Sequence, residues 1–209
     1  MDTRAGYAAG CCDSPLLSNI YLDPLDWTMA MRDFEMVRYA DDFVVLCRSP
    51  EEAAEALAVV QHWTAQAGLT LHGTKTRLVD ARENGFEFLG YRFEAGRRWP
   101  RDKSLKKFKD TIRAKTKRTA GHSLDQIIAD LNRTLRGWFE YFKHSHRATF
   151  RPLDGWIRRR LRSILRKRLG RRGISGGADH QRWTTAFFAA HRLFGLQDAH
   201  VLACQSSRR

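Results

Sequence analysis

Paired cysteines, long apolar runs and an N-terminal signal are all missing from this 209-residue sequence. The four cysteines form no Cys-x-x-Cys pair and have no histidine at ligand spacing, so neither a disulfide framework nor a structural zinc site is expected. The apolar run at 43–47 is far shorter than the ~20 residues that span a bilayer. Residues 1–4 contain no apolar signal core. These absences predict a cytoplasmic protein with no membrane partner.

Acidic residues are scarce in the second half of the chain. Residues 1–100 contain 10 Lys and Arg against 15 Asp and Glu, whereas residues 101–209 contain 27 against 8. The net charges of the two halves are therefore −5 and +19, and the whole chain carries +14. Charge of this density repels itself and needs a polyanionic partner or strong solvation. Nucleic acid is the natural candidate, and a basic tail that only solubilises the protein is the alternative.

The first half of the chain alternates helical and extended patterns. A serine followed by proline at residue 14 starts one helix. Ser49 as the cap, Pro50 as the first helical residue and Glu52 as the capping-box partner start another helix, which ends at Gly68. Two β-rich runs flank Asp41 and Asp42, which is a hairpin pattern with the acids at the turn. The predicted order is a helix over 14–26, a hairpin over 36–47, a helix over 49–68, and strands over 69–71 and 86–93.

The second half is helical and basic. After about residue 99, apolar residues recur at helical spacing, and Ser123 with Gln126 forms a capping-box signal. A further helix begins near Pro152. Ten of the 22 residues over 151–172 are Lys or Arg, and Asp154 is the one acid among them. The expected fold class is therefore α+β, with an antiparallel sheet and packed helices followed by an all-helical basic domain.

Asp41 and Asp42 are the candidates for a catalytic centre. Nucleotidyl transfer needs carboxylates that hold two divalent ions about 4 Å apart. Mg²⁺ takes a few carboxylate oxygens together with water and substrate phosphates. A tight β-turn suits this chemistry because it projects an aspartate from a rigid sheet. An Asp-Asp pair by itself is also ordinary turn chemistry, so the surrounding sequence decides between the two.

The surrounding residues resemble the Tyr-Ala-Asp-Asp motif of reverse transcriptases in its group II intron form, with Met-Val-Arg before it and Phe-Val-Val-Leu after it. Further segments resemble the same family in the same order. They are the helix before the hairpin (14–22), the segment after it (68–76), the last palm strand (86–91) and the maturase-specific helical domain (131–142). The resemblance implies a partial reverse-transcriptase palm over 1–100, a helical thumb and maturase domain over 101–172, and a C-terminal helical tail over 173–209.

The resemblance also implies roles for individual residues near the hairpin. Asp41 would bind the catalytic Mg²⁺ ions, and Asp42 would support the metal and the primer terminus. Lys75 would protonate the pyrophosphate leaving group or contact phosphate, with a solvated surface lysine as the equal alternative. The nucleic acid is expected to contact four residues of the palm: Tyr39, Ala40, Leu89 and Gly90.

In this family the basic half clamps the RNA/DNA template-primer and the folded group II intron RNA. Arginine guanidinium groups fork onto phosphates and stack on bases, which suits structured RNA. The residues expected to bind nucleic acid are Lys106, Lys107, Arg113, Arg158, Arg159, Arg162, Arg166 and Lys167. Trp138, Tyr141 and Trp156 are expected in the core rather than as base-stacking platforms.

One part of the family's pattern does not match. The earlier catalytic aspartate lies on a strand upstream of the first helix, and none of the 13 residues before Ser14 forms such a strand. We therefore expect a fragment of a reverse transcriptase and maturase that binds intron RNA and is inactive in polymerisation by itself. A second chain carrying the missing half could complement it. A non-enzymatic RNA-binding or RNA-chaperone protein is the alternative, and an unfolded gene remnant is a third interpretation.

Overall fold

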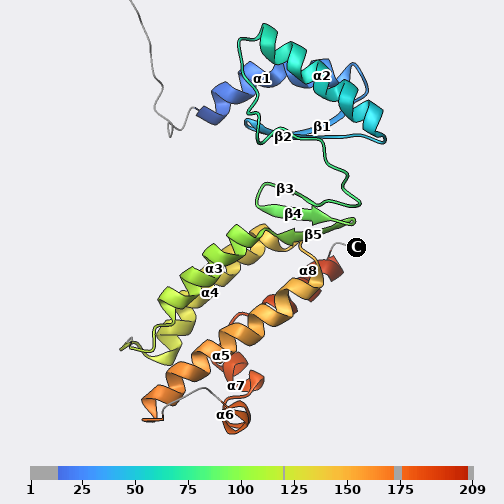
Figure 1. Ribbon diagram of the computed structural model, residues 1–209. Coiled ribbons are helices and arrows are strands. Elements are labelled where there is room, and N and C mark those ends of the chain that lie inside the picture. The colour runs from blue at the N-terminus through green and yellow to red at the C-terminus, as the bar shows by residue number, and fades with distance from the viewer. Residues whose placement is uncertain (1–13, 120, 172–175, 207–209) are drawn as a thin grey trace, which may run out of the picture. The chain divides into compact units, whose positions relative to one another are not determined.

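The computed structural model describes residues 14–119, 121–171 and 176–206 (Figure 1). The fold is α+β, as the sequence predicts, and it divides between Leu89 and Gly90 into two compact units. This division comes about ten residues before the expected palm boundary at residue 100. Among the described residues, we find no helix whose length and apolar character would suffice to cross a membrane.

The first unit is a β-hairpin with two helices on one of its faces (Figure 1). Its elements are α1 (Ser14–Ala30), β1 (Glu35–Tyr39), β2 (Asp42–Leu46), α2 (Pro50–Gln66) and β3 (Phe86–Phe88). Leu25 and Met29 of α1 are fully buried and form a core with Val60 of α2. Met36 of the hairpin packs against this core. The helices therefore cover the inner face of the hairpin and leave its other face open.

The ends of α2 follow the capping signals. Ser49 caps the helix, because its Oγ accepts a hydrogen bond from the backbone N–H of Glu52 at 3.2 Å. The Glu52 carboxylate accepts from the N–H of Arg48 at 2.6 Å instead of completing the predicted capping box with Ser49. At the other end, Gly68 has a positive φ of 67°, as is common after a helix.

Two strand predictions in this unit are wrong. Residues 69–71 form no strand, because the N–H of Leu69 donates to the carbonyl of Thr64 at 2.8 Å and closes the end of α2. The single strand expected over 86–93 is interrupted by a turn. Leu89 and Gly90 have positive φ values of 47° and 78°, which extended backbone cannot contain.

The second unit begins with a hairpin and continues as a helical domain. Its elements are β4 (Tyr91–Glu94), β5 (Arg97–Pro100), α3 (Asp102–Lys115), α4 (Leu124–Phe142), a short 3₁₀ turn (Arg147–Thr149), α5 (Phe150–Arg168), α6 (Gly177–Arg182), α7 (Thr185–Ala190) and α8 (Leu196–Ser206). The predicted capping box of α4 is present: Ser123 Oγ accepts from the N–H of Gln126, and Gln126 Oε1 accepts from the N–H of Ser123.

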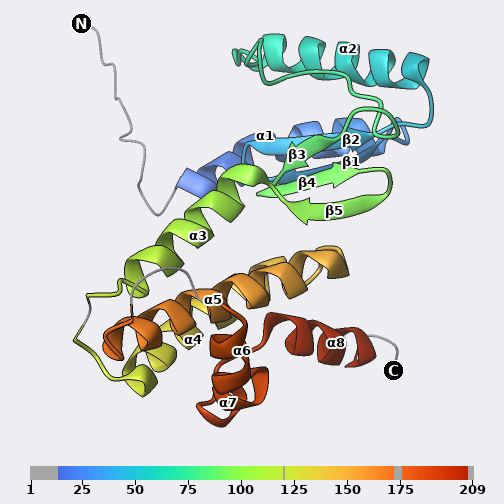
Figure 2. The same cartoon turned by 60° about the horizontal axis from the view of Figure 1, so that its bottom comes forward.

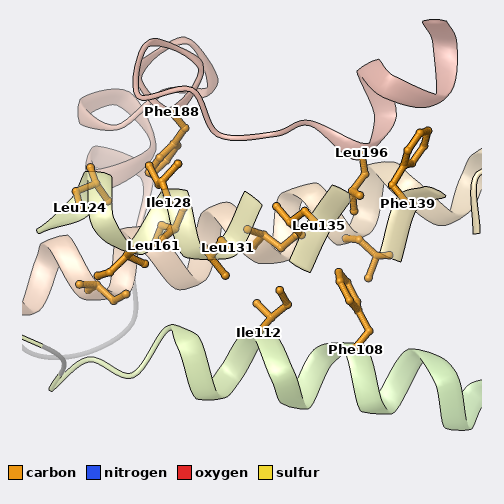
Figure 3. Close-up of a cluster of buried hydrophobic side chains, with 14 of the residues drawn as sticks. Phe108, Ile112, Leu124, Ile128, Leu131, Leu135, Phe139, Leu161, Phe188 and Leu196 are labelled. Carbon is orange, nitrogen blue, oxygen red and sulfur yellow. The ribbon is translucent and has the colours of Figure 1, made fainter. Parts of the chain in front are cut away.

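Three layers of helices form the core of the second unit. Figure 3 shows Ile112 of α3 on one side of α4 and α5, and Phe188 and Leu196 of the C-terminal segment on the other. Leu131 and Leu161 are fully buried between them. Figure 2 shows α6, α7 and α8 gathered on one side of α4 and α5. The expected tail over 173–209 is therefore part of the same core wherever it is described.

Polar side chains of α4 and α5 hold the C-terminal segment in place. Asn132 donates from Nδ2 to the carbonyl of Arg192 and accepts from the N–H of Phe194, both at 2.8 Å. Asp154 accepts from the backbone N–H groups of Leu196 and Gln197 at 3.0 Å each. Asp154 therefore satisfies the first N–H groups of α8 from another helix.

Candidate catalytic turn and nucleic-acid interface

The Asp-Asp pair lies at the tip of the first hairpin. β1 and β2 are antiparallel, and the pairing ends with Tyr39 opposite Asp42. Ala40 and Asp41 therefore form a two-residue turn. Ala40 has a positive φ of 55°, a conformation common in hairpin turns but costly for a residue with a Cβ. The sequence prediction of acids at a hairpin turn is confirmed.

The two faces of the hairpin have different surroundings. Successive residues of a strand point to opposite faces, and directly paired residues share a face. Tyr39, which is 68% exposed, shares the open face with Asp42. Arg38 and Phe43 share the inner face, toward the helices. Asp41 and Asp42 are both exposed, so their carboxylates are accessible from solvent.

Arg38 links the turn to α1. Its guanidinium forms a two-point ion pair with Asp26, in which Nε donates to Oδ1 at 2.8 Å and Nη2 donates to Oδ2. Its Nη1 donates to Asn19 Oδ1 at 3.0 Å and to the carbonyl of Ala40 at 2.8 Å. The hydrogen bonds with Asp26 raise the pKa of Arg38, against the opposing effect of burial. The sequence analysis did not single out Arg38. The alternation of faces along β1 could have revealed it, because it places an arginine where a core-facing residue is expected.

The hairpin presents two candidate ligands for a divalent metal ion. Asp41 and Asp42 are hard oxygen ligands, which suit Mg²⁺ when water and phosphates complete its coordination. Within residues 14–119, 121–171 and 176–206, no group of three or more His, Cys, Asp or Glu side chains could hold a metal ion. Two exposed carboxylates are compatible in type with Mg²⁺, but the described residues do not form a closed two-ion site.

Lys75 is exposed in the irregular segment between α2 and β3. Its N–H donates to the carbonyl of His72 at 3.0 Å, so a local turn sets the path of the chain there. Nothing in this geometry assigns its amine to the Asp41 carboxylate. Its role as a proton donor or phosphate ligand stays a prediction.

Gly90 lies at a turn beside α3 and α4. Its φ of 78° favours glycine. A Cβ at this position would lie 3.4 Å from Ser104 Oγ and 3.7 Å from Tyr141 Cε1. The Gly90 carbonyl accepts from the N–H of Arg101 at 2.9 Å. These Cβ distances are ordinary van der Waals contacts, so the backbone conformation and not a lack of space favours glycine here. The neighbours of Gly90 in the structure are α3 and α4, whereas the sequence suggested contact with nucleic acid. Leu89 beside it is half-buried.

The basic residues of α5 divide into two groups. Arg159 and Lys167 are exposed, and Arg158 is half-buried. Arg162 is only 5% exposed; its Nε donates to the carbonyl of Trp183 at 2.8 Å, and burial lowers its pKa. The placement of Arg162 argues against the predicted RNA contact, because its guanidinium is enclosed by the protein.

Arg166 is also used inside the second unit. Its Nη1 donates to Asp179 Oδ2 at 2.6 Å, and the Asp179 side chain is 2% exposed. Burial acts to raise the pKa of Asp179, but the hydrogen bond from Arg166 helps to outweigh this effect and the pKa is lowered. The ion pair ties α6 to α5, so Arg166 has a structural role that its sequence position did not reveal.

Cations on α3 form the other part of the basic surface. Lys106 and Lys107 are exposed. Arg113 is exposed as well, but it pairs with Asp110 at 2.6 Å and its guanidinium lies 5.7 Å from the ring centre of Trp156. Arg160, which was not singled out from the sequence, donates to the carbonyl of Thr116 at 3.1 Å and closes the C-terminal end of α3.

The three aromatic residues expected in the core differ in exposure. Trp138 is half-buried and stacks on Phe108 with 4.4 Å between ring centres. Trp156 is half-buried beneath guanidinium groups. Tyr141 is 54% exposed, although it contacts Tyr91, so the expectation that it lies in the core is wrong.

Comparison with known families agrees with the two units of the fold. The family described as reverse transcriptase (RNA-dependent DNA polymerase) matches residues 2–93, and the family described as group II intron, maturase-specific domain, matches residues 105–183. Together the two matches cover 171 of the 209 residues. A comparison with curated proteins finds no match. The chain belongs to the group II intron reverse transcriptase and maturase family.

Proposed function

We propose that this chain binds group II intron RNA through the exposed cations of its second unit. We further propose that its first unit carries the metal-binding turn of an RNA-directed DNA polymerase. The observation that supports the proposal most directly is the different environment of acidic and basic side chains in the second unit. Its acids are largely engaged within the protein, whereas a set of exposed lysines and arginines has no acidic partner among the described residues.

The engaged acids explain why so much positive charge remains free. Asp130 accepts from Lys115 at 2.7 Å and from Arg133 at 3.0 Å. Asp154 is buried against the start of α8, and Asp179 is buried against Arg166. Binding the phosphates of RNA would neutralise the remaining cations and release counterions.

Among the cations that the sequence predicts to bind nucleic acid, four are exposed and form no ion pair in the described part of the chain: Lys106, Lys107, Arg159 and Lys167. We assign phosphate contacts to these four residues, with Arg158 and Arg113 as additional donors. Arginine adds the forked geometry that suits phosphate oxygens, and lysine adds a point charge. Because the contacts are to phosphates, the affinity should depend on ionic strength more than on base sequence.

Reverse transcriptases use divalent metal ions for polymerisation. We propose that Asp41 and Asp42 hold such an ion, Mg²⁺ in the cell, at the hairpin turn. When bound, the ion would lower the pKa of the primer hydroxyl and neutralise the triphosphate. Asp41, at the tip of the turn, would bind the metal, and Asp42, on the open face beside Tyr39, would support it. Tyr39 and Ala40 would lie next to the primer terminus, and Lys75 is an exposed cation available for a phosphate.

Two carboxylates do not complete a two-ion site. The chain by itself is therefore proposed to bind RNA without extending a primer. A second chain that brought another carboxylate next to Asp41 would complete the site, so complementation in trans is part of the proposal. The template-primer and the intron RNA are the proposed partners.

Salt-dependent RNA binding tests the proposed interface. Two double variants, Lys106→Gln with Lys107→Gln and Arg159→Gln with Lys167→Gln, each remove two exposed cations that have no acidic partner among the described residues. Each should weaken the binding of a structured intron RNA. Each should also flatten the log–log salt slope by roughly 1.4 to 1.8, since one phosphate contact contributes roughly 0.7 to 0.9.

The matched control removes two cations that already have acidic partners, the exposed Arg133 and the half-buried Lys143, by Arg133→Gln with Lys143→Gln. This control should change the slope by less than half as much. If the control variant loses as much affinity as the test variants, net charge rather than a defined surface binds the RNA. Competition between RNAs gives a comparison that needs no substitution: structured intron RNA should displace bound RNA better than a single strand of equal length.

A further inference from the structure

Arg38 occupies an unusual position for an arginine in a small β-hairpin. Its side chain is only 10% exposed, and it lies on the inner face, beside core residues. Four hydrogen bonds use all three of its nitrogen atoms, with acceptors on α1 and on the turn. An arginine in this place costs desolvation free energy, which these charge-assisted hydrogen bonds offset.

The acceptors lie on two separate elements. Asn19 and Asp26 are two helical turns apart on one face of α1, and Ala40 is in the turn between β1 and β2. The same Nη1 atom donates both to Asn19 and to the Ala40 carbonyl. The orientation of the Ala40–Asp41 peptide is thus coupled to the position of α1.

The Ala40 carbonyl is the acceptor that matters for the metal-binding turn. Ala40 has a φ of 55°, a strained conformation for alanine, and such a conformation persists only when its surroundings hold it. The hydrogen bond from Arg38 fixes the peptide plane that directly precedes the Cα of Asp41. Any change in this plane would turn the Asp41 side chain.

We propose that Arg38 is the positioning residue of the catalytic turn. It transmits the rigidity of α1 through Asp26 and Asn19 to the Ala40 carbonyl, and so holds Asp41 in one orientation. The consequence for metal binding rests on the function proposed above for Asp41. The claim about the shape of the turn is independent of any metal.

The substitution Arg38→Lys distinguishes the positioning role of Arg38 from the effect of its positive charge. Arg38→Lys keeps a cation that can pair with Asp26, but its single ammonium group cannot also reach Asn19 and the Ala40 carbonyl in the geometry of a guanidinium. Arg48→Lys is the matched control. Arg48 is exposed just beyond the other end of β2, and its described hydrogen bond to Glu52 is made by the backbone N–H.

Amide hydrogen exchange of the full chain, followed by NMR without metal, is the first measurement. In Arg38→Lys, exchange over residues 39–42 should accelerate at least tenfold, whereas exchange over 35–36 and 45–46 at the other end of the hairpin should change less than threefold. Arg48→Lys should leave residues 39–42 unchanged. Equal acceleration at both ends of the hairpin, or none at the turn, would show that Arg38 only stabilises the fold and would overturn the proposal.

Mn²⁺ titration of the same samples is the second measurement. In the parent chain, Mn²⁺ should broaden the amide signals of residues 39–43, and the midpoint of this broadening should rise several-fold in Arg38→Lys but not in Arg48→Lys. If Mn²⁺ broadens nothing near Asp41 in the parent chain, the proposed metal role of Asp41 fails, and the exchange data still decide the role of Arg38. If Mn²⁺ binds both chains equally well, Arg38 does not position the metal ligand and the proposal is wrong.

Discussion

Replacing Asp154 by alanine should destabilise the second unit more than any other change of a single acidic residue in α5 or α8. Asp154 is 6% exposed and accepts from the backbone N–H groups of Leu196 and Gln197 at 3.0 Å each. A buried donor left without a partner costs about 1–3 kcal/mol. The Leu196 N–H is buried and the Gln197 N–H is partly accessible to water. The expected loss in unfolding free energy is therefore about 2–4 kcal/mol.

Urea-induced unfolding, followed by far-UV circular dichroism, measures this loss. A decrease of about 3 kcal/mol should lower the urea midpoint by roughly 1–2 M. Asp198→Ala is the matched control, because Asp198 is an exposed acid in the first turn of α8. Its removal should cost less than about 1 kcal/mol, the usual contribution of an acid at a helix N-terminus. The reasoning is refuted if Asp154→Ala unfolds within about 1 kcal/mol of the parent chain, on the order of that control.

The pH dependence of the stability of the parent chain and of Asp154→Asn gives an independent check. Burial raises the pKa of Asp154, although the hydrogen bonds from Gln197 and Leu196 act to lower it. The folded state therefore keeps the proton to a higher pH than the unfolded chain does. The contribution of this protonation to the free energy of unfolding is fully present below the usual Asp pKa. It is lost as the pH rises through the folded-state pKa of Asp154. The stability of the parent chain relative to Asp154→Asn should accordingly decrease over that interval, and an increase would contradict the assignment.

Three further outcomes are expected. The purified chain should show no primer extension on an RNA template with Mg²⁺ or Mn²⁺, because only two carboxylates meet at the turn; extension that disappears in Asp41→Asn would contradict this. Arg162→Ala should lower the unfolding free energy by about 2–3 kcal/mol in urea unfolding, since a buried hydrogen bond to a charged group is lost, whereas Arg159→Ala should stay within about 0.5 kcal/mol. Hydrogen bonds from Lys115 lower the pKa of Asp130, so the stability difference between the parent chain and Asp130→Asn should be present at neutral pH. In urea titrations this difference should disappear as the pH falls below the usual Asp value of 3.8 and through the folded-state pKa, and a difference that persists at the lowest pH would argue against the ion pair.

The sequence by itself determined the starts of two helices, the hairpin with the acidic pair, and the family. Serine caps at Ser49 and Ser123 start helices where predicted, because a cap needs only a side chain and the N–H group three residues later. The hairpin with its acids at the turn follows from the two β-rich runs that flank Asp41 and Asp42. The charge difference between the halves is a property of composition, and the family motifs are contiguous segments of chain.

The tertiary structure alone decided which cations are free. On α5, Arg159 is exposed but Arg162 and Arg166 are engaged within the protein, although all three look alike in an arginine-rich sequence. The acceptors that engage them, Trp183 and Asp179, lie in and just after α6, and helical periodicity within α5 carries no information about that later segment. Arg38 is a parallel case, since its partner Asp26 lies 12 residues earlier on another element. Whether a polar side chain is buried depends on partners that reach it through space, and only the folded chain brings those partners together.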